Sequence, residues 1–557
     1  MVGLATVFGA GGGTSSYAEI EDTDVIVMWG SNAREAHPIF FHHVMAGIRN
    51  GAKMFVVDPR RTSTARWADR WLGLNVGTDI ALSNTIAREI IAAGLANQSF
   101  IQNSTSDFEA YKASVEQWTL EVGEFVTGVP ADAIRQLAHA YATADRAQLC
   151  WTLGITEHHN GVDNVLSLIN LALLCGHVGR HGAGLNPLRG QNNVQGGGDM
   201  GAIPNKLPGF QDMLDADARL KFDKAWGSNI PDHYGWHLTE MFEAMGRGEL
   251  KAVYVLGENP AQSEADSAHA VHLLEGLERL VVQDMFLTKT AQLADVVLPA
   301  SAAWCETEGT VTNSERRVQR VRKALQAPEG ARDDVEIILQ LAERLGHKWE
   351  YSCAEDIFNE LRSLSPMHFG MTYARLEAEG GLQWPCPSLT ELEPTYLHGR
   401  LWDEDPARRG RLARFSVVID DPPVDTLSAD FPLRLTTGRR LDSYNTGVQS
   451  GGFQSPLRRG ESIDIGPVDA ARLGLEVGEY VHVSSRRGTI TAPVTIDPAL
   501  RPGLVFMSMH FPDEIDTNII TIEATDPKAG TAEFKASAVR IDKISLHIDA
   551  LQPVAGE

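Results

Sequence analysis

The chain has 557 residues, of which 43% are hydrophobic and 22% are charged, and this length predicts a globular protein of three or four domains. Its 73 acidic residues outnumber 49 basic ones, and the net charge of −24 argues against nucleic acid and anionic membranes as partners. No apolar stretch is long enough to span a membrane, and the N-terminus lacks the basic start of a signal peptide, so we expect a cytoplasmic protein.

The first feature along the chain is a glycine-rich run at residues 9–14 (GAGGGT). It fails as a dinucleotide fingerprint because its sixth position is Thr14 and because it precedes the first expected strand instead of following it. Two interpretations stay open: a turn, or a close approach of the backbone to a ligand.

Apolar runs at 24–29 and 53–57, separated by a helical stretch at 35–49, predict a βαβ unit and hence a parallel sheet. Gly30 and Asn32 follow the first strand, and Asp58 follows the second. Open α/β sheets bind ligands at such strand ends, where a carboxylate can accept hydrogen bonds from a ribose or a guanine. The alternative for Asp58 is a helix N-cap ahead of a proline.

Helical stretches at 79–96, 107–118, 131–144 and 161–176 lead to a loop rich in glycine and asparagine at 188–201. Glu157 and His158 follow Gly154 and are candidates for the same cleft. Arg189 stands in the loop, and a guanidinium is a natural bidentate partner for a small carboxylate. From spacing alone, however, pairing of this arginine with a phosphate or a structural acid is favoured.

The strand pattern returns at 252–256, followed by Gly257, and at 280–283, followed by Asp284. We interpret the two βαβ segments as equivalent nucleotide-binding halves, although such units also recur in α/β proteins without that meaning. Residues 350–425 contain many prolines and are expected to be irregular. Short alternating strands at 433–437, 479–484, 489–496 and 503–509 then predict a β-barrel.

No residue is assigned as a metal ligand. The five cysteines, at positions 150, 175, 305, 353 and 386, are scattered and include no CxxC pair, so they predict neither a zinc site nor an iron–sulfur cluster. The histidine pairs at 42–43 and 158–159 are adjacent, and neighbouring residues on a helix point in different directions.

The loop RGQNNVQG at 189–196, followed by DMG at 199–201, resembles the signature loop of formate dehydrogenase catalytic (alpha) subunits. These are molybdopterin oxidoreductases of the dimethyl-sulfoxide-reductase type. Further matching stretches are GSNAREAHP at 30–38, DPR at 58–60, GTD at 77–79, GENP at 257–260, QD at 283–284, TKT at 288–290, ADVVLP at 294–299 and ETEG at 306–309.

The resemblance implies an α/β fold with doubly wound parallel-sheet domains and a C-terminal β-barrel domain of the double-psi type. It divides the chain into a first α/β domain at 1–190, a second at 191–350, a connecting region at 351–428 and a barrel at 429–557. Each α/β domain would hold one arm of a bis-molybdopterin guanine dinucleotide that carries molybdenum or tungsten.

The family positions imply catalytic roles for Arg189, which would orient formate, and for Gln191 beside it. The residues implied to bind the cofactor are Gly30, Asn32, Glu35, Asp58, Arg60, Gly77, Asp79, Gly154, Gly257, Glu258, Gln283, Asp284, Thr288, Arg439, Ser443, Asn445, His510, Asn518 and Lys535. The implied reaction converts formate to carbon dioxide, and its electrons pass to an iron–sulfur and flavin subunit that reduces NAD.

One departure from the family concerns the metal ligand. Val2-Gly3-Leu4 matches the end of a family segment whose cysteine or selenocysteine binds the metal and whose adjacent histidine assists proton transfer. These residues and the cluster cysteines are expected upstream of Met1. Two alternatives therefore remain: a cofactor-binding fragment without turnover, or another molybdopterin oxidoreductase such as a nitrate reductase.

Overall fold

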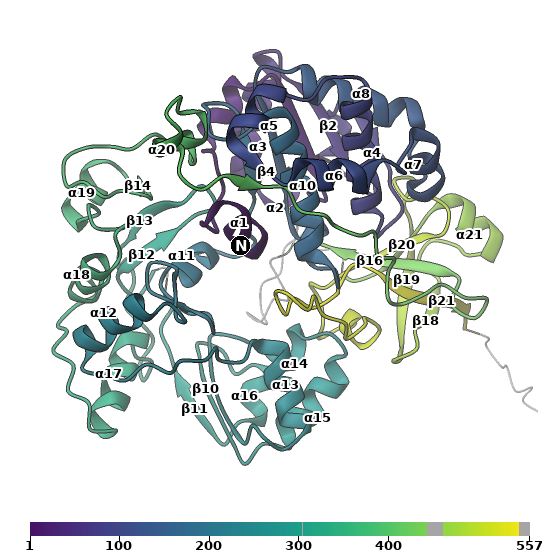
Figure 1. Cartoon of the computed structure of the whole chain (residues 1–557). Coiled ribbons are helices and arrows are strands. Elements are labelled where there is room, and N and C mark those ends of the chain that lie inside the picture. The colour runs from purple at the N-terminus through teal and green to yellow at the C-terminus, as the bar shows by residue number, and fades with distance from the viewer. Residues whose placement is uncertain (304, 442, 444–459, 545–557) are drawn as a thin grey trace, which may run out of the picture.

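The computed structural model describes residues 1–303, 305–441, 443 and 460–544. Figure 1 shows a first α/β unit (purple and blue) opposite a second (teal), with a C-terminal barrel (green to yellow) beside them. The expected fold class, parallel α/β sheets with a C-terminal β-barrel, is confirmed. Within the described ranges, no helix combines the length and apolar character needed to cross a membrane.

The first unit is built on a five-stranded sheet in the order β3-β2-β1-β5-β6, with all strands parallel. Its strands are β1 (Val25–Trp29), β2 (Lys53–Val57), β3 (Arg70–Leu72), β5 (Ala147–Trp151) and β6 (Gly184–Pro187). Every residue of β1 is buried, as its unbroken apolar run predicts for a strand covered on both faces. Strand order reverses between β1 and β5, which is where open α/β sheets bind ligands.

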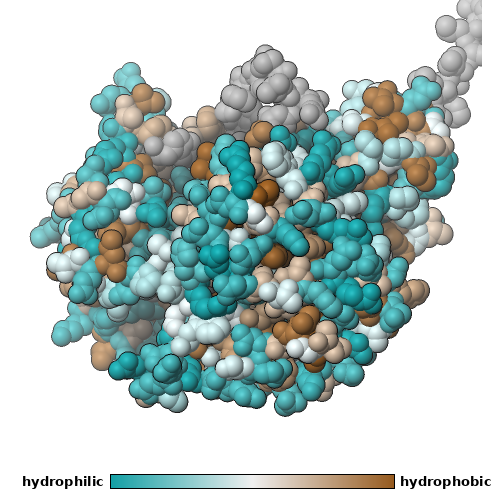
Figure 2. Space-filling view, turned by 90° about the horizontal axis from the view of Figure 1, so that it is seen from above, coloured by the Kyte–Doolittle hydropathy of each residue, from teal (hydrophilic) through white to brown (hydrophobic). Residues whose placement is uncertain are grey.

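Helices cover both faces of this sheet, and the apolar α10 lies almost entirely in the core. The helices of the unit are α1 (Val2–Phe8), α2 (Ala33–Ala36), α3 (Pro38–Arg49), α4 (Asp79–Ala92), α5 (Gln98–Ser104), α6 (Phe108–Val115), α7 (Leu120–Thr127), α8 (Ala131–Thr143), α9 (Leu153–Thr156) and α10 (Gly161–Cys175). The next helix, α11 (Val194–Asp199), lies outside this unit beside the strand Gly309–Thr312. Figure 2 views the molecule from above and shows a mostly hydrophilic face with small apolar groups.

A distant segment completes the first unit. Strand β15 (Ala413–Arg414) pairs in parallel with β4 (Thr105–Ser106). The next residue, Phe415, is 1% exposed and stacks on Tyr111 at a ring-centroid distance of 5.1 Å. The predicted domain boundary at residue 190 stays a prediction, but the core of this unit draws on residues more than 200 positions beyond it.

The second unit has a smaller parallel sheet in the order β11-β10-β9. Its elements are β9 (Ala252–Leu256), β10 (Arg279–Asp284), β11 (Val296–Pro299), α13 (Leu238–Gly246), α14 (Pro260–Ser263), α15 (Ser267–Glu275) and α16 (Lys289–Leu293). Val255, Leu280 and Val282 pack under these helices, whereas Tyr254 and Leu256 on the alternate face of β9 are 40% and 46% exposed. This sheet is therefore less covered than the first.

The segment expected to be irregular between 350 and 425 contains helices, so that expectation was wrong. The elements around it are β7 (Lys206–Leu207), β8 (Gln211–Asp212), α12 (Ala216–Trp226), β12 (Gly309–Thr312), β13 (Arg317–Val321), α17 (Asp334–Arg344), α18 (Ala354–Leu364), α19 (Tyr373–Ala378), β14 (Leu382–Gln383) and α20 (Pro406–Arg409). The prolines lie outside α18 and α19 or at the first position of α20, where a helix tolerates them.

The barrel closes in the order β16-β20-β17-β19-β18-β21. Its strands are β16 (Leu433–Gly438), β17 (Ile463–Ile465), β18 (Tyr480–Ser484), β19 (Thr489–Ile496), β20 (Leu504–Ser508) and β21 (Ser537–Lys543), with α21 (Pro467–Leu473) between β17 and β18. Alternate residues such as Val481, Val483 and Val505 fill its interior. The end of β16 points toward the first unit, which places the barrel against the strand ends of that sheet.

Candidate active site

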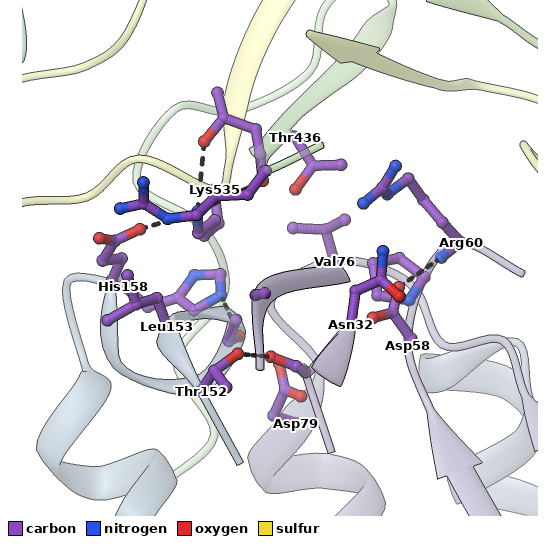
Figure 3. Close-up of a pocket in the computed structure, with 18 of the residues that line it drawn as sticks. Asn32, Asp58, Arg60, Val76, Asp79, Thr152, Leu153, His158, Thr436 and Lys535 are labelled. Carbon is purple, nitrogen blue, oxygen red and sulfur yellow. Dashed lines mark hydrogen bonds and ion pairs between the residues drawn. The ribbon is translucent and has the colours of Figure 1, made fainter. Parts of the chain in front are cut away.

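A cleft opens at the carboxyl ends of the first sheet and is bounded on the other side by the barrel. In Figure 3, Asp58 and Arg60 face His158 and Lys535 across it. The predicted cofactor residues that line this cleft are Gly30, Asn32, Asp58, Arg60, Gly77, Asp79, Gly154, Arg439 and Lys535. Residues predicted from two separate parts of the sequence thus share one cavity.

The floor of the cleft depends on two glycines in close contact. Gly30 has φ +57°, and a Cβ on it would lie 2.8 Å from the carbonyl carbon of Gly154. A Cβ on Gly154 would lie 2.5 Å from the Gly30 oxygen, which accepts hydrogen bonds from the Gly154 amide and from the Thr152 hydroxyl. Neither position accommodates a side chain, so backbone forms this part of the cleft.

Two buried carboxyl groups lie at the cleft. Burial raises the pKa of Asp58 to about 6, although the neighbouring Arg60 opposes the shift. Burial also raises the pKa of Asp79, whose Oδ1 accepts a hydrogen bond of 2.8 Å from the Trp29 indole. Nearby charges and hydrogen bonds compensate only in part for the burial of these two carboxyl groups, so both can still accept hydrogen bonds from a ligand.

The opposite wall carries an ion pair and a buried histidine. Lys535 Nζ lies 2.7 Å from Glu157 Oε2 and connects the barrel to the first unit. His158 Nδ1 lies 3.3 Å from Glu533, and although burial lowers the pKa of His158, this carboxylate raises it above its ordinary value. Glu157 and His158, considered from the sequence for the same cleft, both line it.

A second, more polar cavity shares Asn32, Arg60 and Arg439 with the cleft. Arginines dominate its lining: Arg34, Arg60, Arg61, Arg66, Arg439 and Arg440. The predicted Glu35 lines it as well. The Arg60 guanidinium lies 3.6 Å from the ring centroid of Phe506 in the barrel, so the wall between the cavities is itself an interdomain contact. Concentrated guanidinium groups of this kind suit phosphate.

The predicted substrate arginine lies beside the cleft. Leu188 and Gly190 line the cleft, whereas the Arg189 side chain turns toward the N-terminal glycine run. Its Nε donates to Gln195 Oε1 at 3.0 Å, and its Nη2 donates to the Gly11 carbonyl at 2.6 Å. The glycine run therefore makes its close approach to this arginine. The predicted Gln191 is exposed.

The predicted residues of the second unit occupy equivalent places on their own sheet. The Gly30 amide donates to Val57 O, and the Gly257 amide likewise donates to Gln283 O. Asn32 Oδ1 accepts from the Thr64 hydroxyl at 2.9 Å, and Asn259 Oδ1 accepts from the Thr290 hydroxyl at 2.7 Å. The matching hydrogen bonds support the equivalence of the two halves. Gly257 and Glu258 are exposed, Asp284 is half-buried, and Gln283 and Thr288 are buried.

The remaining predicted residues belong to the barrel and its loops. Asn518, in the 3-10 helix Thr517–Ile519, donates from Nδ2 to Gln262 O at 3.0 Å and so contacts the second unit. His510 Nε2 accepts a hydrogen bond of 2.8 Å from the Arg440 amide. The Ser443 amide donates to the Arg440 carbonyl at 3.5 Å, and Asn445 lies outside the described residues.

Comparisons with known proteins agree with this geometry. Residues 6–344 match the family model described as "Molybdopterin oxidoreductase", and residues 433–538 match the "Molydopterin dinucleotide binding domain". The chain belongs to the molybdopterin oxidoreductase family. The second match covers the barrel that closes the cleft, so a molybdopterin dinucleotide is the ligand class expected of this family member.

Relatives and a solved structure cover almost the whole of this molybdopterin oxidoreductase. It is 41% identical to F420-dependent formate dehydrogenase 2 subunit alpha of Methanococcus maripaludis, over 98% of this chain and 80% of the relative. It is 37% identical to formate dehydrogenase H of Escherichia coli, over 100% and 78%. Acetylene hydratase from Pelobacter acetylenicus shares the fold, with a TM-score of 0.75 and 21% identity over 98% and 80%. The resemblance to formate dehydrogenase alpha subunits is confirmed.

Sequence reasoning missed some residues of this site in the molybdopterin oxidoreductase. Arg440 lines the second cavity and pairs with Asp464 at 3.0 Å. His37 lines the cleft, and its Nε2 lies 2.6 Å from the Arg189 carbonyl oxygen. His37 could have been predicted, because it lies in the stretch at 30–38 that matches the family. The only sequence feature that pointed to Arg440 was its position next to Arg439.

Proposed function

We propose that this chain binds molybdopterin guanine dinucleotide in the two joined cavities and oxidises formate to carbon dioxide, a proton and two electrons. The assignment of formate as the substrate rests on Arg189, whose side chain is held beside the cleft by two hydrogen bonds, in a chain whose relatives are named formate dehydrogenases. Arginine has five N–H donors, and within the described residues Arg189 uses one on Gln195 and one on Gly11. The remaining donors suit a carboxylate.

The residues present fit the proposed cofactor. Gly30 and Gly154 leave a floor without side chains, against which a flat group can lie. The arginines of the second cavity would neutralise a pyrophosphate, and Asp58 would accept hydrogen bonds from a ribose or a guanine. When bound, the metal held by the cofactor supplies the acceptor for the two electrons.

A second cofactor arm is assigned to the second unit, through Glu258, Gln283, Asp284 and Thr288, with Asn518 as the contact from the barrel. The support is the matched set of hydrogen bonds at Gly257 and Asn259. Electrons would leave to a partner subunit with iron–sulfur clusters. We propose NAD reduction by a flavin subunit as the exit, with F420 as the competing acceptor because three relatives are named F420-dependent.

Arg189 contributes binding and electrostatics to the reaction. Two parallel N–H···O bonds would fix the formate carboxylate and thereby direct its C–H bond. The positive charge would also offset the charge of the bound carboxylate. Burial lowers the pKa of the guanidinium to about 10, so it remains charged at neutral pH.

The test is formate-dependent reduction of a viologen dye by protein produced in a host that makes the cofactor, with nitrate reduction assayed in parallel. Arg189→Ala should lower formate turnover more than ~100-fold while retaining the pterin, measured by its fluorescence after extraction. The exposed Arg247→Ala is the matched control. Pterin binding without formate turnover in the unsubstituted chain would overturn the proposed reaction and favour a cofactor-binding chain; nitrate turnover would favour another enzyme of the family.

A further inference from the structure

A chain of buried hydrogen bonds lies behind Arg189. Trp384 Nε1 donates to Asp199 Oδ2 at 2.7 Å, Gln195 Nε2 donates to Asp199 Oδ1 at 2.8 Å, and Arg189 Nε donates to Gln195 Oε1 at 3.0 Å. Gln195 and Asp199 are both 1% exposed. They stand four residues apart on α11, which places them on the same face of the helix.

The donors and acceptors in this series of hydrogen bonds can be arranged in only one way. An ionised carboxylate only accepts hydrogen bonds, and both oxygens of Asp199 are occupied by N–H donors. Gln195 must therefore present its NH2 group to Asp199, which leaves its carbonyl oxygen facing Arg189. With the amide reversed, NH2 would meet the guanidinium and neither group could accept.

The far end of the chain is anchored in the core. Trp384 is 3% exposed and packs beside the fully buried Arg316, which donates to Gly13 O at 2.9 Å and to Thr395 O at 2.6 Å. A Cβ on Gly12 would lie 2.5 Å from the Trp384 ring and 2.7 Å from Arg316 Cδ. The glycine run thus passes between this anchor and Arg189, whose second fixed bond is to Gly11.

We propose that Asp199 is a positioning residue, which fixes the amide of Gln195 and, through it, the guanidinium that receives the substrate carboxylate. This role rests on the proposed function of Arg189. Asp199 would act on the substrate only indirectly, through the side chains of Gln195 and Arg189. Because Trp384 and Gln195 hold both carboxylate oxygens, the orientation of Arg189 depends on a residue that lies 185 positions beyond Asp199 in the sequence.

Exchanging the carboxylate at position 199 with the amide at position 195 leaves the net charge unchanged and tests the direction of these hydrogen bonds. Asp199→Asn replaces one acceptor with a donor, so the new amide satisfies either Trp384 or the normal Gln195 orientation, but not both. Gln195→Glu places a second carboxylate against Asp199. The double substitution restores every bond, because the new carboxylate at position 195 accepts from Arg189 and from the new amide NH2 at position 199. The amide oxygen at position 199 then accepts from Trp384. Asp430→Asn, at an exposed position, is the charge-matched control.

The first readout is the rate at which phenylglyoxal modifies Arg189 in the cofactor-free protein, measured by peptide mass spectrometry. Each single substitution should raise this rate about 5- to 20-fold, and the double should return it to within about 2-fold of the unsubstituted chain. Melting temperatures identify any variant that fails to fold. Equal rates in all variants, or a double no better than the worse single, would overturn the role of Asp199.

The second readout separates this role from the reaction itself. In cofactor-loaded protein, each single substitution should raise KM for formate about 10- to 100-fold with a smaller change in kcat, and the double should recover it. If formate is not the substrate, every form including the unsubstituted chain lacks turnover, while the modification rates still decide the positioning role. An unchanged KM in an active Asp199→Asn enzyme would contradict the inference.

Discussion

The two α/β units have the same local design and different surroundings. In each, a glycine after one strand donates to the next strand, and an aspartate at the end of that next strand accepts from the backbone amide two residues on: Asp58 from Arg60 and Asp284 from Phe286, both at 2.9 Å. Yet β1 is buried throughout, whereas β9 exposes alternate residues. The barrel presses Phe506 and Lys535 against the first unit and reaches the second mainly through a loop.

The comparison shows that the strand–glycine–strand–aspartate pattern places polar groups at a sheet edge in both units, whereas the burial of those groups depends on whether a second body faces that edge. The barrel does so at the first unit, and there burial raises the pKa of Asp58 to about 6. Three pairs of substitutions, two at equivalent positions of the units and one at their interfaces with the barrel, test how far the surroundings decide the behaviour.

The largest difference is expected at the paired glycines. Gly30→Ala adds a Cβ that overlaps the Gly154 backbone and also forces a positive φ, so it should destabilise the first unit by about 3–5 kcal/mol. Gly257→Ala has φ +63° with open space around its Cβ and should cost about 1 kcal/mol. Hydrogen exchange of β1 and β9 measures each unit separately. Similar costs at both glycines would show that the close contact contributes nothing.

The next effect concerns the two interfaces of the barrel. Lys535→Met leaves Glu157 as an uncompensated carboxylate in the cleft and should destabilise the protein by about 3 kcal/mol, with partial recovery on adding Glu157→Gln. At the second unit, His269 and Glu523 lie 2.9 Å apart but are 47% and 44% exposed, so His269→Gln should cost under about 1 kcal/mol. Urea unfolding curves compare the variants, and equal losses would contradict the difference in burial.

The smallest effect is the pH dependence of the two aspartates. The pKa of folded Asp58, about 6, exceeds the ordinary value of 3.8, and burial is the cause, with Arg60 and Lys535 opposing it and Asp79 adding to it. The folded state therefore loses stability as pH rises from about 4 to about 6, and the loss persists above that range. Asp58→Asn should remove this loss and stabilise cofactor-free protein at pH 8 by about 2 kcal/mol.

Asp284→Asn is the matched control, because burial also raises the pKa of Asp284 but the residue is only half-buried. We expect a smaller gain from it, measured as the melting temperature of both variants between pH 4 and pH 8. If Asp58→Asn gave no gain at pH 8, the carboxylate would be better solvated in the cleft than its burial indicates. The same variant should bind the pterin cofactor more weakly.

The strands were the most predictable part of the fold. The runs at 53–57, 252–256 and 489–496 coincide with β2, β9 and β19, because each apolar or alternating run ends at a turn residue. Helices α18 and α19 were missed, since prolines near them suggested an irregular chain although none falls inside either helix. Proline restricts its own position and its neighbour, so its density over a long region says little about the segments between.

At the site, the sequence predicted residues that follow strands and did not predict contacts between distant segments. Gly30 and Asp58 line the cleft as their positions in the first βαβ unit suggest, and Asp79 lines it as the family resemblance implies. The bond from Trp384 to Asp199 joins residues 185 positions apart, and the contact of Arg60 with Phe506 depends on how the barrel docks. Such pairs carry no periodic pattern, so only the folded chain reveals them.

The pairing of β15 with β4 has a consequence for biosynthesis. The ribosome finishes the first unit's sheet at Pro187, but Phe415 and the strand before it, which complete the unit's core beside Tyr111, emerge more than 200 residues later. Until then the nascent unit exposes an apolar surface, which is a hazard for aggregation during translation. Fragments that end before about residue 420 will share this defect, so expression of the first unit alone requires the segment around β15 to be supplied.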